Sequence, residues 1–418
     1  MKKIYILVFI VFSAVNNFAQ CNGRYQTDIY PTINVSTVQY GTNTDLVPQT
    51  VNLMMDIYQP QGDTATSRPL IILAHSGSFS GGDKGDADQV YFATELAKKG
   101  YVCASINYRL APSAFSLIVA ETTVKVVFMA IQDGKAAVRF FKNDAATSDV
   151  YKINPDQIFF GGTSAGGILG INLAYVDSVS DLTPQWQTWL NEVGGLEGNS
   201  GNPGYCSRVN GTFGFAGGIA DTSFIDSNDV PWYGSHALTD VTVKYNYGQP
   251  LNGFTPVYLY GSGLINTSLN NVGTYNHLDT YAGGNHPPFN SSSSILQDNK
   301  DSLTIFLYNI LDCNPGNLQK PNQKNCSNSP QPLSFDEFVN NEIDVKIYPN
   351  PFNADLNITL NEFNNTTISI INIVGKEVVR KKVTSYISKI DLAHLPIGFY
   401  LIRISSNENT FTQKVIKK

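Results

Sequence analysis

The sequence has few charged side chains, few cysteines and few histidines, and each scarcity narrows what the protein can be. Charged residues make up 15% of the 418, the formal net charge is -6 and no long basic run occurs, so nucleic acid is not expected as a partner. The five cysteines form no CxxC motif and no cluster with histidine. No metal site and no cofactor are therefore expected. A hydrophobic content of 42% and this length instead suit a globular chain of two domains.

The N-terminus has the pattern of a secretory signal peptide. Lys2 and Lys3 precede a nearly unbroken apolar run from Ile4 to Val15, and small residues follow it. A membrane-spanning helix needs about 20 apolar residues, and this run is shorter. We expect residues 1–20 to be a signal peptide and the remainder to be exported. No other segment is long and apolar enough to span a membrane.

Export permits disulfides, and five cysteines leave at least one unpaired within the chain. Cys103 lies in an apolar, β-branched run and is expected to be a buried free thiol in a strand. We expect Cys313 to pair with Cys326, because both lie close together in a loop-rich stretch. Pairing of Cys21 with Cys206 is a weaker expectation.

From about residue 50 to 310 the pattern alternates between strand and helix. The strands are expected at Val51–Tyr58, Leu70–Ala74, Tyr101–Tyr108 and 157–161, and the helices at Asp86–Lys99, Glu121–Phe141 and 167–174. This order predicts an α/β architecture, with a mostly parallel sheet covered by helices. Ligands of such sheets bind outside the carboxyl ends of the strands. Residues 177–209 interrupt the pattern and form either a small lid or a surface excursion.

Composition changes after Asp312. The stretch 315–334 is rich in Pro, Asn, Gln, Ser and Lys without apolar periodicity, and residues 315–343 are therefore expected to form a linker. Short alternating strands then fill 344–418 and predict a small all-β sandwich. The predicted domains are thus 21–314 and 344–418.

The segment Gly162-Thr163-Ser164-Ala165-Gly166 has the form GxSxG and lies between a predicted strand and a predicted helix. This is the context of a nucleophile elbow, in which a sharp turn exposes a strained serine. The residues two before and two after that serine must be small, and here both are glycine. We expect Ser164 to be a catalytic nucleophile, the alternative being a structural Gly/Ser turn.

A serine hydroxyl needs a base to remove its proton, and a histidine base needs a carboxylate to orient it. His286, in a Gly-rich loop after a predicted strand, is the preferred base, and His277 is the second choice. Asp240 is the preferred acid. The other acids considered are Asp221, Asp226 and Asp229. The resulting chain order Ser, Asp, His is that of α/β-hydrolases.

A serine nucleophile that attacks a carbonyl group also needs N–H donors nearby for the negative oxygen that develops. The stretch His75-Ser76-Gly77-Ser78-Phe79 follows an apolar strand, and its small residues let backbone N–H groups face a cavity. We expect the oxyanion hole to be formed by Gly77, Ser78 and Ala165.

Four motifs in this order resemble secreted carboxylesterases and lipases of the α/β-hydrolase superfamily with an HGGGF loop. Residues 75–79 match that loop, 162–167 match its GxSAGG elbow, 236–240 match HGTxD, and 283–286 match GxGH. Serines replace two of the loop glycines, and Ala237 replaces the glycine before the acid. The resemblance implies an α/β-hydrolase fold and a serine carboxylic ester hydrolase acting through an acyl-enzyme. The expected substrates are short-chain acyl esters or acetyl and feruloyl esters of polysaccharide.

The C-terminal segment resembles the sorting domain of the type IX secretion system of Bacteroidetes. Residues 347–352 (Ile-Tyr-Pro-Asn-Pro-Phe) match its opening, and 373–378 and 395–402 match its body. The resemblance implies export through the periplasm and outer membrane, recognition by the type IX machinery, and a secreted or cell-surface product. The alternative is a carbohydrate-binding β-sandwich.

Two other functions are compatible with the sequence. The hydrolase scaffold could serve, without catalysis, as a surface binding module, as the serines in the oxyanion loop suggest. A peptidase on the same fold is the second alternative, although the sequence shows no propeller or large N-terminal domain beside the hydrolase segment.

Overall fold

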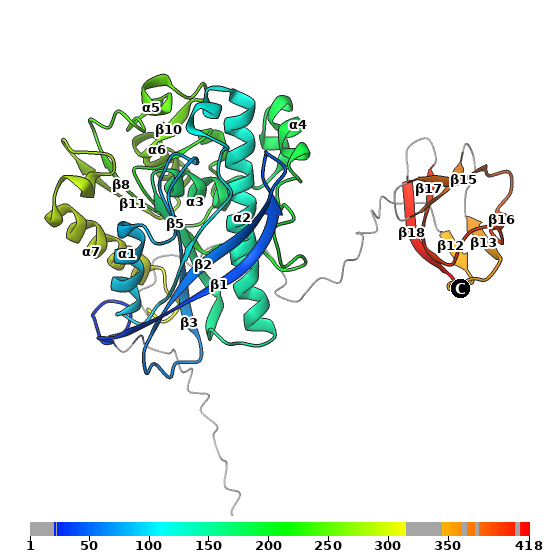
Figure 1. Ribbon diagram of the computed structural model, residues 1–418, viewed down its shortest axis with the longest axis horizontal. Coiled ribbons are helices and arrows are strands. Elements are labelled where there is room, and N and C mark those ends of the chain that lie inside the picture. The colour runs from blue at the N-terminus through cyan, green and yellow to red at the C-terminus, as the bar shows by residue number, and fades with distance from the viewer. Residues whose placement is uncertain (1–20, 22, 315–344, 361–365, 373–375, 406–409) are drawn as a thin grey trace, which may run out of the picture. The chain divides into compact units, whose positions relative to one another are not determined.

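The computed structural model describes residues 21, 23–314, 345–360, 366–372, 376–405 and 410–418 (Figure 1). The expected signal peptide and the expected linker lie outside these residues. The chain divides into two compact units, 1–330 and 331–418, and the predicted domain ends at 314 and 344 fall on either side of this division. Among the described residues, no helix is both long and apolar enough to cross a membrane.

The first unit is built on a sheet of eight strands in the order β1-β2-β4-β3-β5-β6-β8-β11. Their bounds are β1 (Ile33–Thr44), β2 (Thr50–Pro60), β3 (Arg68–Ala74), β4 (Val102–Ile106), β5 (Ile153–Thr163), β6 (Gly211–Phe215), β8 (Trp232–Ala237) and β11 (Asn276–Tyr281). From β4 to β11 the neighbours are parallel, whereas β1 and β2 are antiparallel at one edge. The predicted, mostly parallel sheet is therefore confirmed. The half-exposed edge strand β1 was not predicted.

Helices cover both faces of this sheet (Figure 1). On one face lie α2 (Ala120–Ala146) and α3 (Ala165–Tyr175), and on the other lie α1 (Ala87–Ala97) and α7 (Ser293–Asn309). Every residue of β3 and β4 is buried, and most of these residues are apolar, as expected for parallel strands covered by helices on both faces.

Smaller elements complete this unit. They are the helices α4 (Pro184–Glu192), α5 (Pro250–Gly253) and α6 (Ser262–Val272), the short turns η1 (Ala114–Ile118), η2 (Val179–Asp181), η3 (Thr222–Phe224) and η4 (Pro288–Ser291), and a second sheet of β7 (Gly218–Ile219), β10 (Leu259–Gly261) and β9 (Tyr247–Gly248). The interrupting segment 177–209 contains η2 and α4.

The disulfide pairing differs from both expectations. Cys21 bonds to Cys313, with a Cα–Cα distance of 5.1 Å across a sequence separation of 292. The expected pairs Cys313–Cys326 and Cys21–Cys206 are therefore wrong, and Cys206 is itself disulfide-bonded. Closeness in sequence, which favoured the Cys313–Cys326 pair, does not decide which cysteines the fold brings together. The fold brings Cys21 against the segment that follows α7, where Cys21 and Cys313 join one apolar cluster. Cys103 is confirmed as a buried free thiol in β4.

The second unit has two antiparallel sheets around one core. The first is β12 (Val345–Tyr348), β13 (Asp355–Leu360) and β16 (Ile387–Asp391), and the second is β15 (Glu377–Lys382), β14 (Thr367–Asn372), β17 (Gly398–Ser405) and β18 (Thr410–Lys417). Alternate residues of β13 are buried, as expected for a strand with one face on a core. Leu356, Ile358, Ile370 and Ile402 are fully buried there. The predicted small β domain is confirmed.

Candidate active site

Four loops meet at the carboxyl ends of the parallel strands, where ligands of such sheets bind. Gly77 and Ser78 follow β3, and Ser164 follows β5 directly. Asp240 follows β8, and His286 follows β11. The preferred residues of the sequence analysis thus lie at the same end of the sheet.

The turn between β5 and α3 places Ser164 in a rare backbone conformation, with φ 54° and ψ -111°. A non-glycine residue with positive φ is strained, and strain of this kind is common at active sites. The turn also brings the backbone close to β3. A Cβ atom on Gly162 or on Gly166 would overlap the carbonyl oxygen of Ala74. The two glycines of the GxSxG segment are therefore required for the turn to pack against β3.

A continuous chain of hydrogen bonds joins the three preferred side chains. The Nε2 atom of His286 lies 2.6 Å from the Oγ atom of Ser164. The Nδ1 atom of His286 lies 2.6 Å from the Oδ2 atom of Asp240. Because a carboxylate only accepts, Nδ1 carries the proton and Nε2 is left to accept from the Ser164 hydroxyl. The imidazole is thus held in the tautomer that a general base requires.

Asp240 is buried and is surrounded by donors. Its Oδ1 atom accepts the backbone N–H groups of Thr242 at 2.8 Å and Val243 at 3.1 Å. Its Oδ2 atom lies near His286 and 3.2 Å from the Nε2 atom of His236. Burial alone would raise the pKa of Asp240, but the hydrogen bonds from His236 and His286 outweigh it and hold that pKa well below its usual range. Asp240 is therefore ionised throughout the neutral range.

The other residues considered for these roles have hydrogen-bond partners other than Ser164 and His286. His277 is half-exposed and its Nε2 atom lies 2.9 Å from the Oδ1 atom of Asp279. Asp229 accepts the backbone N–H of Asp226 at 2.7 Å, Asp226 accepts that of Asn228, and Asp221 accepts that of Ser223. The geometry thus brings together the first choices and leaves the alternatives outside that series of hydrogen bonds.

The loop after β3 has three consecutive residues with positive φ: Gly77 (108°), Ser78 (55°) and Phe79 (58°). A Cβ atom on Gly77 would overlap the carbonyl oxygen of Gly81, so the loop needs glycine there. Ser78 lines one pocket together with Ser164 and Ala165. Within the described residues, the N–H groups of Ser78 and Ala165 have no hydrogen-bond acceptor. Both can therefore donate to a bound oxygen.

His75, at the start of this loop, packs against Tyr108. Its ring stacks on Tyr108 with centroids 4.2 Å apart, and the Tyr108 hydroxyl donates to the carbonyl oxygen of His75 at 2.8 Å. Burial lowers the pKa of His75, which favours a neutral ring. In the part of the chain that the structure describes, no group of three or more His, Cys, Asp or Glu side chains could hold a metal ion.

Comparison with known families agrees with this fold. Residues 55–194, which include the loop after β3 and the GxSxG segment, match the BD-FAE family model, an esterase-type α/β-hydrolase family. Residues 346–418 match the secretion system C-terminal sorting domain. The chain carries an esterase-type α/β-hydrolase domain and a sorting domain. The sorting domain indicates export through the type IX system to the cell surface or beyond, as the sequence predicted.

Solved structures similar to the esterase-type domain include esterases. Esterase 2 of Thermogutta terrifontis, in the form described as phosphoramylated by tabun, is 18% identical over 65% of this chain and 92% of that one, with a TM-score of 0.45. The butyrate-bound form of the same esterase is 18% identical over 65% of this chain and 92% of that one, with a TM-score of 0.44. A bifunctional GH43-CE protein of Bacteroides eggerthii is 23% identical over 60% of this chain and 33% of that one, with a TM-score of 0.44. No curated protein sequence matches the chain.

Sequence reasoning missed several partners of Asp240 in the esterase-type domain. His236 was noted only as the first residue of an HGTxD-like segment, and the donors from Thr242 and Val243 were not predicted. The signal available was the histidine four residues before the preferred acid. The other donors are backbone groups, which carry no sequence signature.

Proposed function

We propose that the esterase-type domain hydrolyses carboxylic esters through an acyl-enzyme intermediate on Ser164. His286 acts as general base and then as general acid, and Asp240 orients His286 and stabilises its cation. Gly77, Ser78 and Ala165 supply the N–H donors of the oxyanion hole. The hydrogen-bonded series Ser164–His286–Asp240, beside the donors of Ser78 and Ala165, is the observation that carries this proposal.

The reaction proceeds in two steps. The Oγ atom of Ser164 attacks the acyl carbon while its proton passes to Nε2 of His286, and the carbonyl oxygen takes the negative charge. Collapse of this intermediate expels the alcohol, which receives the proton from His286. Water then attacks the acyl-enzyme with His286 again as base, which frees the carboxylic acid and restores Ser164.

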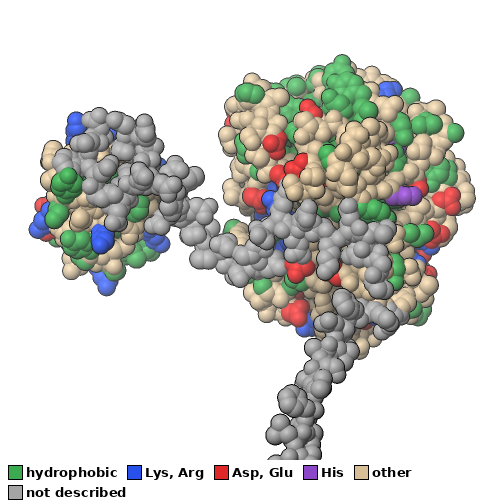
Figure 2. Space-filling model, turned by 180° about the vertical axis from the view of Figure 1, so that it is seen from behind, with side chains coloured by type: hydrophobic (Ala, Val, Ile, Leu, Met, Phe, Trp, Pro, Cys, Tyr) green, Lys and Arg blue, Asp and Glu red, His purple; other side chains and the backbone are tan. Residues whose placement is uncertain are grey.

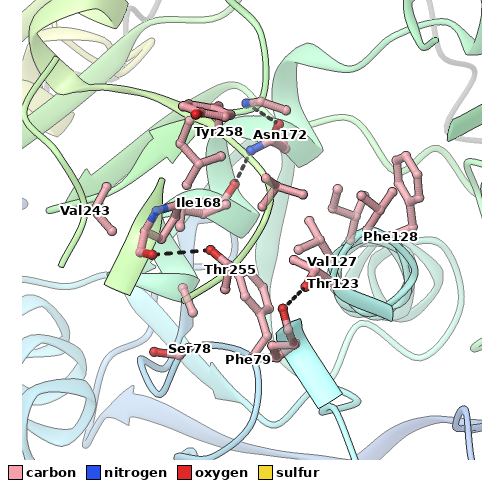
Figure 3. A pocket seen from close by; sticks show the side chains of 18 of the residues that line it. Ser78, Phe79, Thr123, Val127, Phe128, Ile168, Asn172, Val243, Thr255 and Tyr258 are labelled. Carbon is pink, nitrogen blue, oxygen red and sulfur yellow. Dashed lines mark hydrogen bonds between the residues drawn. The ribbon is translucent and has the colours of Figure 1, made fainter. Parts of the chain in front are cut away.

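One pocket beside Ser164 suits the acyl group of the substrate. In Figure 3, Ser78 and Phe79 lie at one end of it, Val127 and Phe128 of α2 form one wall, and Thr255 and Val243 lie opposite. Its cavity volume is about 90 Å³ and no charged side chain lines it. His286 must face the leaving alcohol, and His286 does not line this pocket. The pocket is therefore on the acyl side, and its apolar walls favour a hydrophobic acyl chain or ring.

Four exposed aromatic side chains belong to the segments that line the pocket, and one of them, Tyr258, lines the pocket itself. The rings of Phe115 and Phe254 are 6.2 Å apart between centroids, and those of Tyr247 and Tyr258 are stacked at 5.2 Å. Figure 2 shows hydrophobic side chains gathered at the upper end of this domain, the end at which Figure 1 places α5. Such rings offer flat surfaces to aromatic groups and sugar rings. We infer that the substrates are short-chain acyl esters or acyl esters carried by polysaccharide, including feruloyl esters.

The segment 177–209 supplies part of the pocket wall through Leu182 and Trp186. The lid role expected as one of two possibilities for this segment stays a prediction.

Hydrolysis of p-nitrophenyl acetate by the full chain tests the proposal. Ser164→Ala and His286→Ala should each abolish turnover, whereas His277→Ala should not. Asp240→Asn should lower kcat strongly and Asp229→Asn should leave it unchanged. Hydrolysis that survives in Ser164→Ala would remove the proposed nucleophile, and a loss confined to His277→Ala would move the base.

A further inference from the structure

A second histidine contacts the acid of the proposed triad. His236 lies in β8, one residue before the strand ends, and its side chain is fully buried. Its Nε2 atom lies 3.2 Å from the Oδ2 atom of Asp240 and 3.0 Å from the carbonyl oxygen of Val243. Its Nδ1 atom lies 2.8 Å from the Oγ atom of Ser262, the first residue of α6. Both ring nitrogens therefore have partners.

These partners define the tautomer of His236. The Val243 carbonyl and the Asp240 carboxylate only accept hydrogen bonds, so Nε2 must carry a proton and donate. The Ser262 hydroxyl can then donate to Nδ1, which leaves the ring neutral. The titratable groups that face the ring are the Asp240 carboxylate and the Tyr245 ring, which meets it edge-on with centroids 5.7 Å apart. From α6 the ring is met by the Ser262 hydroxyl.

The Oδ2 atom of Asp240 is consequently shared between two imidazoles. His286 approaches it at 2.6 Å and His236 at 3.2 Å, while Oδ1 accepts two backbone N–H groups. With both oxygens held, the carboxylate has one orientation, and that orientation points Oδ2 at His286. A donor on Oδ2 also removes part of the negative charge that His286 would otherwise feel.

We propose that His236 is a positioning residue for the triad, holding the carboxylate of Asp240 toward His286 and limiting the basicity of His286. The proposal rests on the roles assigned above to Ser164, Asp240 and His286. His236 does not touch the substrate. It acts through Asp240, and the Ser262 hydroxyl provides a hydrogen-bond partner for its other ring nitrogen.

The test compares His236→Phe, which keeps a ring without an N–H group, with His236→Gln, whose amide N–H can replace Nε2–H. The control is His277→Gln, at the half-exposed histidine of β11. All variants are made in the full chain and assayed with p-nitrophenyl butyrate across pH, with thermal unfolding measured in parallel. Hydrogen bonds to charged groups are worth enough that His236→Phe should lower kcat by about 10- to 100-fold. KM should change little, and His236→Gln should recover most of the loss.

The pH dependence of kcat/KM distinguishes a positioning role of His236 from a role in packing alone. Without the donor from His236, more of the charge on Oδ2 acts on His286, so the acid limb of kcat/KM should move to higher pH in His236→Phe. It should stay in place in His236→Gln and in the control. A wild-type kcat and acid limb in His236→Phe would overturn the proposal. So would equal losses in the Phe and Gln variants with an unmoved acid limb, because that result indicates a packing role alone.

Two further variants keep the outcomes distinct. Should His236→Phe fail to fold, His236→Leu takes its place, because it too removes the Nε2–H donor. A lower kcat and a raised acid limb are expected there, and wild-type behaviour would overturn the proposal. Hydrolysis that persists in Ser164→Ala would instead refute the triad itself, whatever the His236 variants do.

Discussion

The apolar pocket predicts a preference for acyl chains longer than acetyl. Butyrate carries two more methylene groups than acetate, and each buried methylene contributes about 0.8 kcal/mol. If the pocket buries both of them in the transition state, the gain is about 1.6 kcal/mol, or about 15-fold in kcat/KM. The assay compares p-nitrophenyl acetate with p-nitrophenyl butyrate, which share one leaving group. The ratio therefore reports the acyl side alone.

A substitution that fills the pocket should remove this preference. Val127 lies in the wall that α2 contributes, and Val127→Trp adds a large ring to a cavity of about 90 Å³. We expect the rate with butyrate to fall toward that with acetate, while the rate with acetate changes by less than about threefold. The matched control is Val150→Trp, at an exposed valine that does not line the pocket. A wild type that prefers acetate, or a Val127→Trp variant that loses both activities equally, would refute the acyl assignment.

Three further predictions concern stability and the elbow. Burial raises the pKa of Asp229 to about 7, so its favourable contribution is complete below about pH 4 and is lost as pH rises through 7. Asp229→Asn should thus be the more stable protein at pH 8, by up to about 4 kcal/mol in urea unfolding, and equal stability there would contradict this. Replacing Cys21 and Cys313 with serine should lower the free energy of unfolding by up to about 5 kcal/mol, because the bond closes a very long loop. An unchanged unfolding midpoint would contradict this expectation. Gly166→Ala should lose hydrolysis or soluble expression, because the new methyl group overlaps Ala74; full activity would show that the elbow relaxes.

Much of the candidate active site could be predicted because its sequence signals are local. The GxSxG segment specifies a turn that tolerates no Cβ two residues before or after Ser164, and that constraint is visible in the sequence. The alternation of apolar strands and helices predicted the parallel sheet in the same way. That sheet places the ends of β3, β5, β8 and β11 together, although they lie far apart along the chain.

The features that the sequence did not reveal depend on contacts with other segments of the chain. The bond between Cys21 and Cys313 joins residues 292 apart, and no local pattern indicates it. His236 becomes informative only when α6 brings Ser262 to its other nitrogen. The edge strand β1 has a half-exposed, largely polar pattern, which is a weak strand signal without its partner β2.

The central claim is that the acyl group of the substrate is transferred to Ser164. The most direct measurement is to quench the full chain in acid during turnover of p-nitrophenyl butyrate, digest it and locate the butyryl group by mass spectrometry. The account predicts butyryl on the peptide that contains Ser164 in the wild type, and neither label nor turnover in Ser164→Ala. Turnover by Ser164→Ala at the wild-type rate, or butyryl on another residue that is kinetically competent, would contradict it.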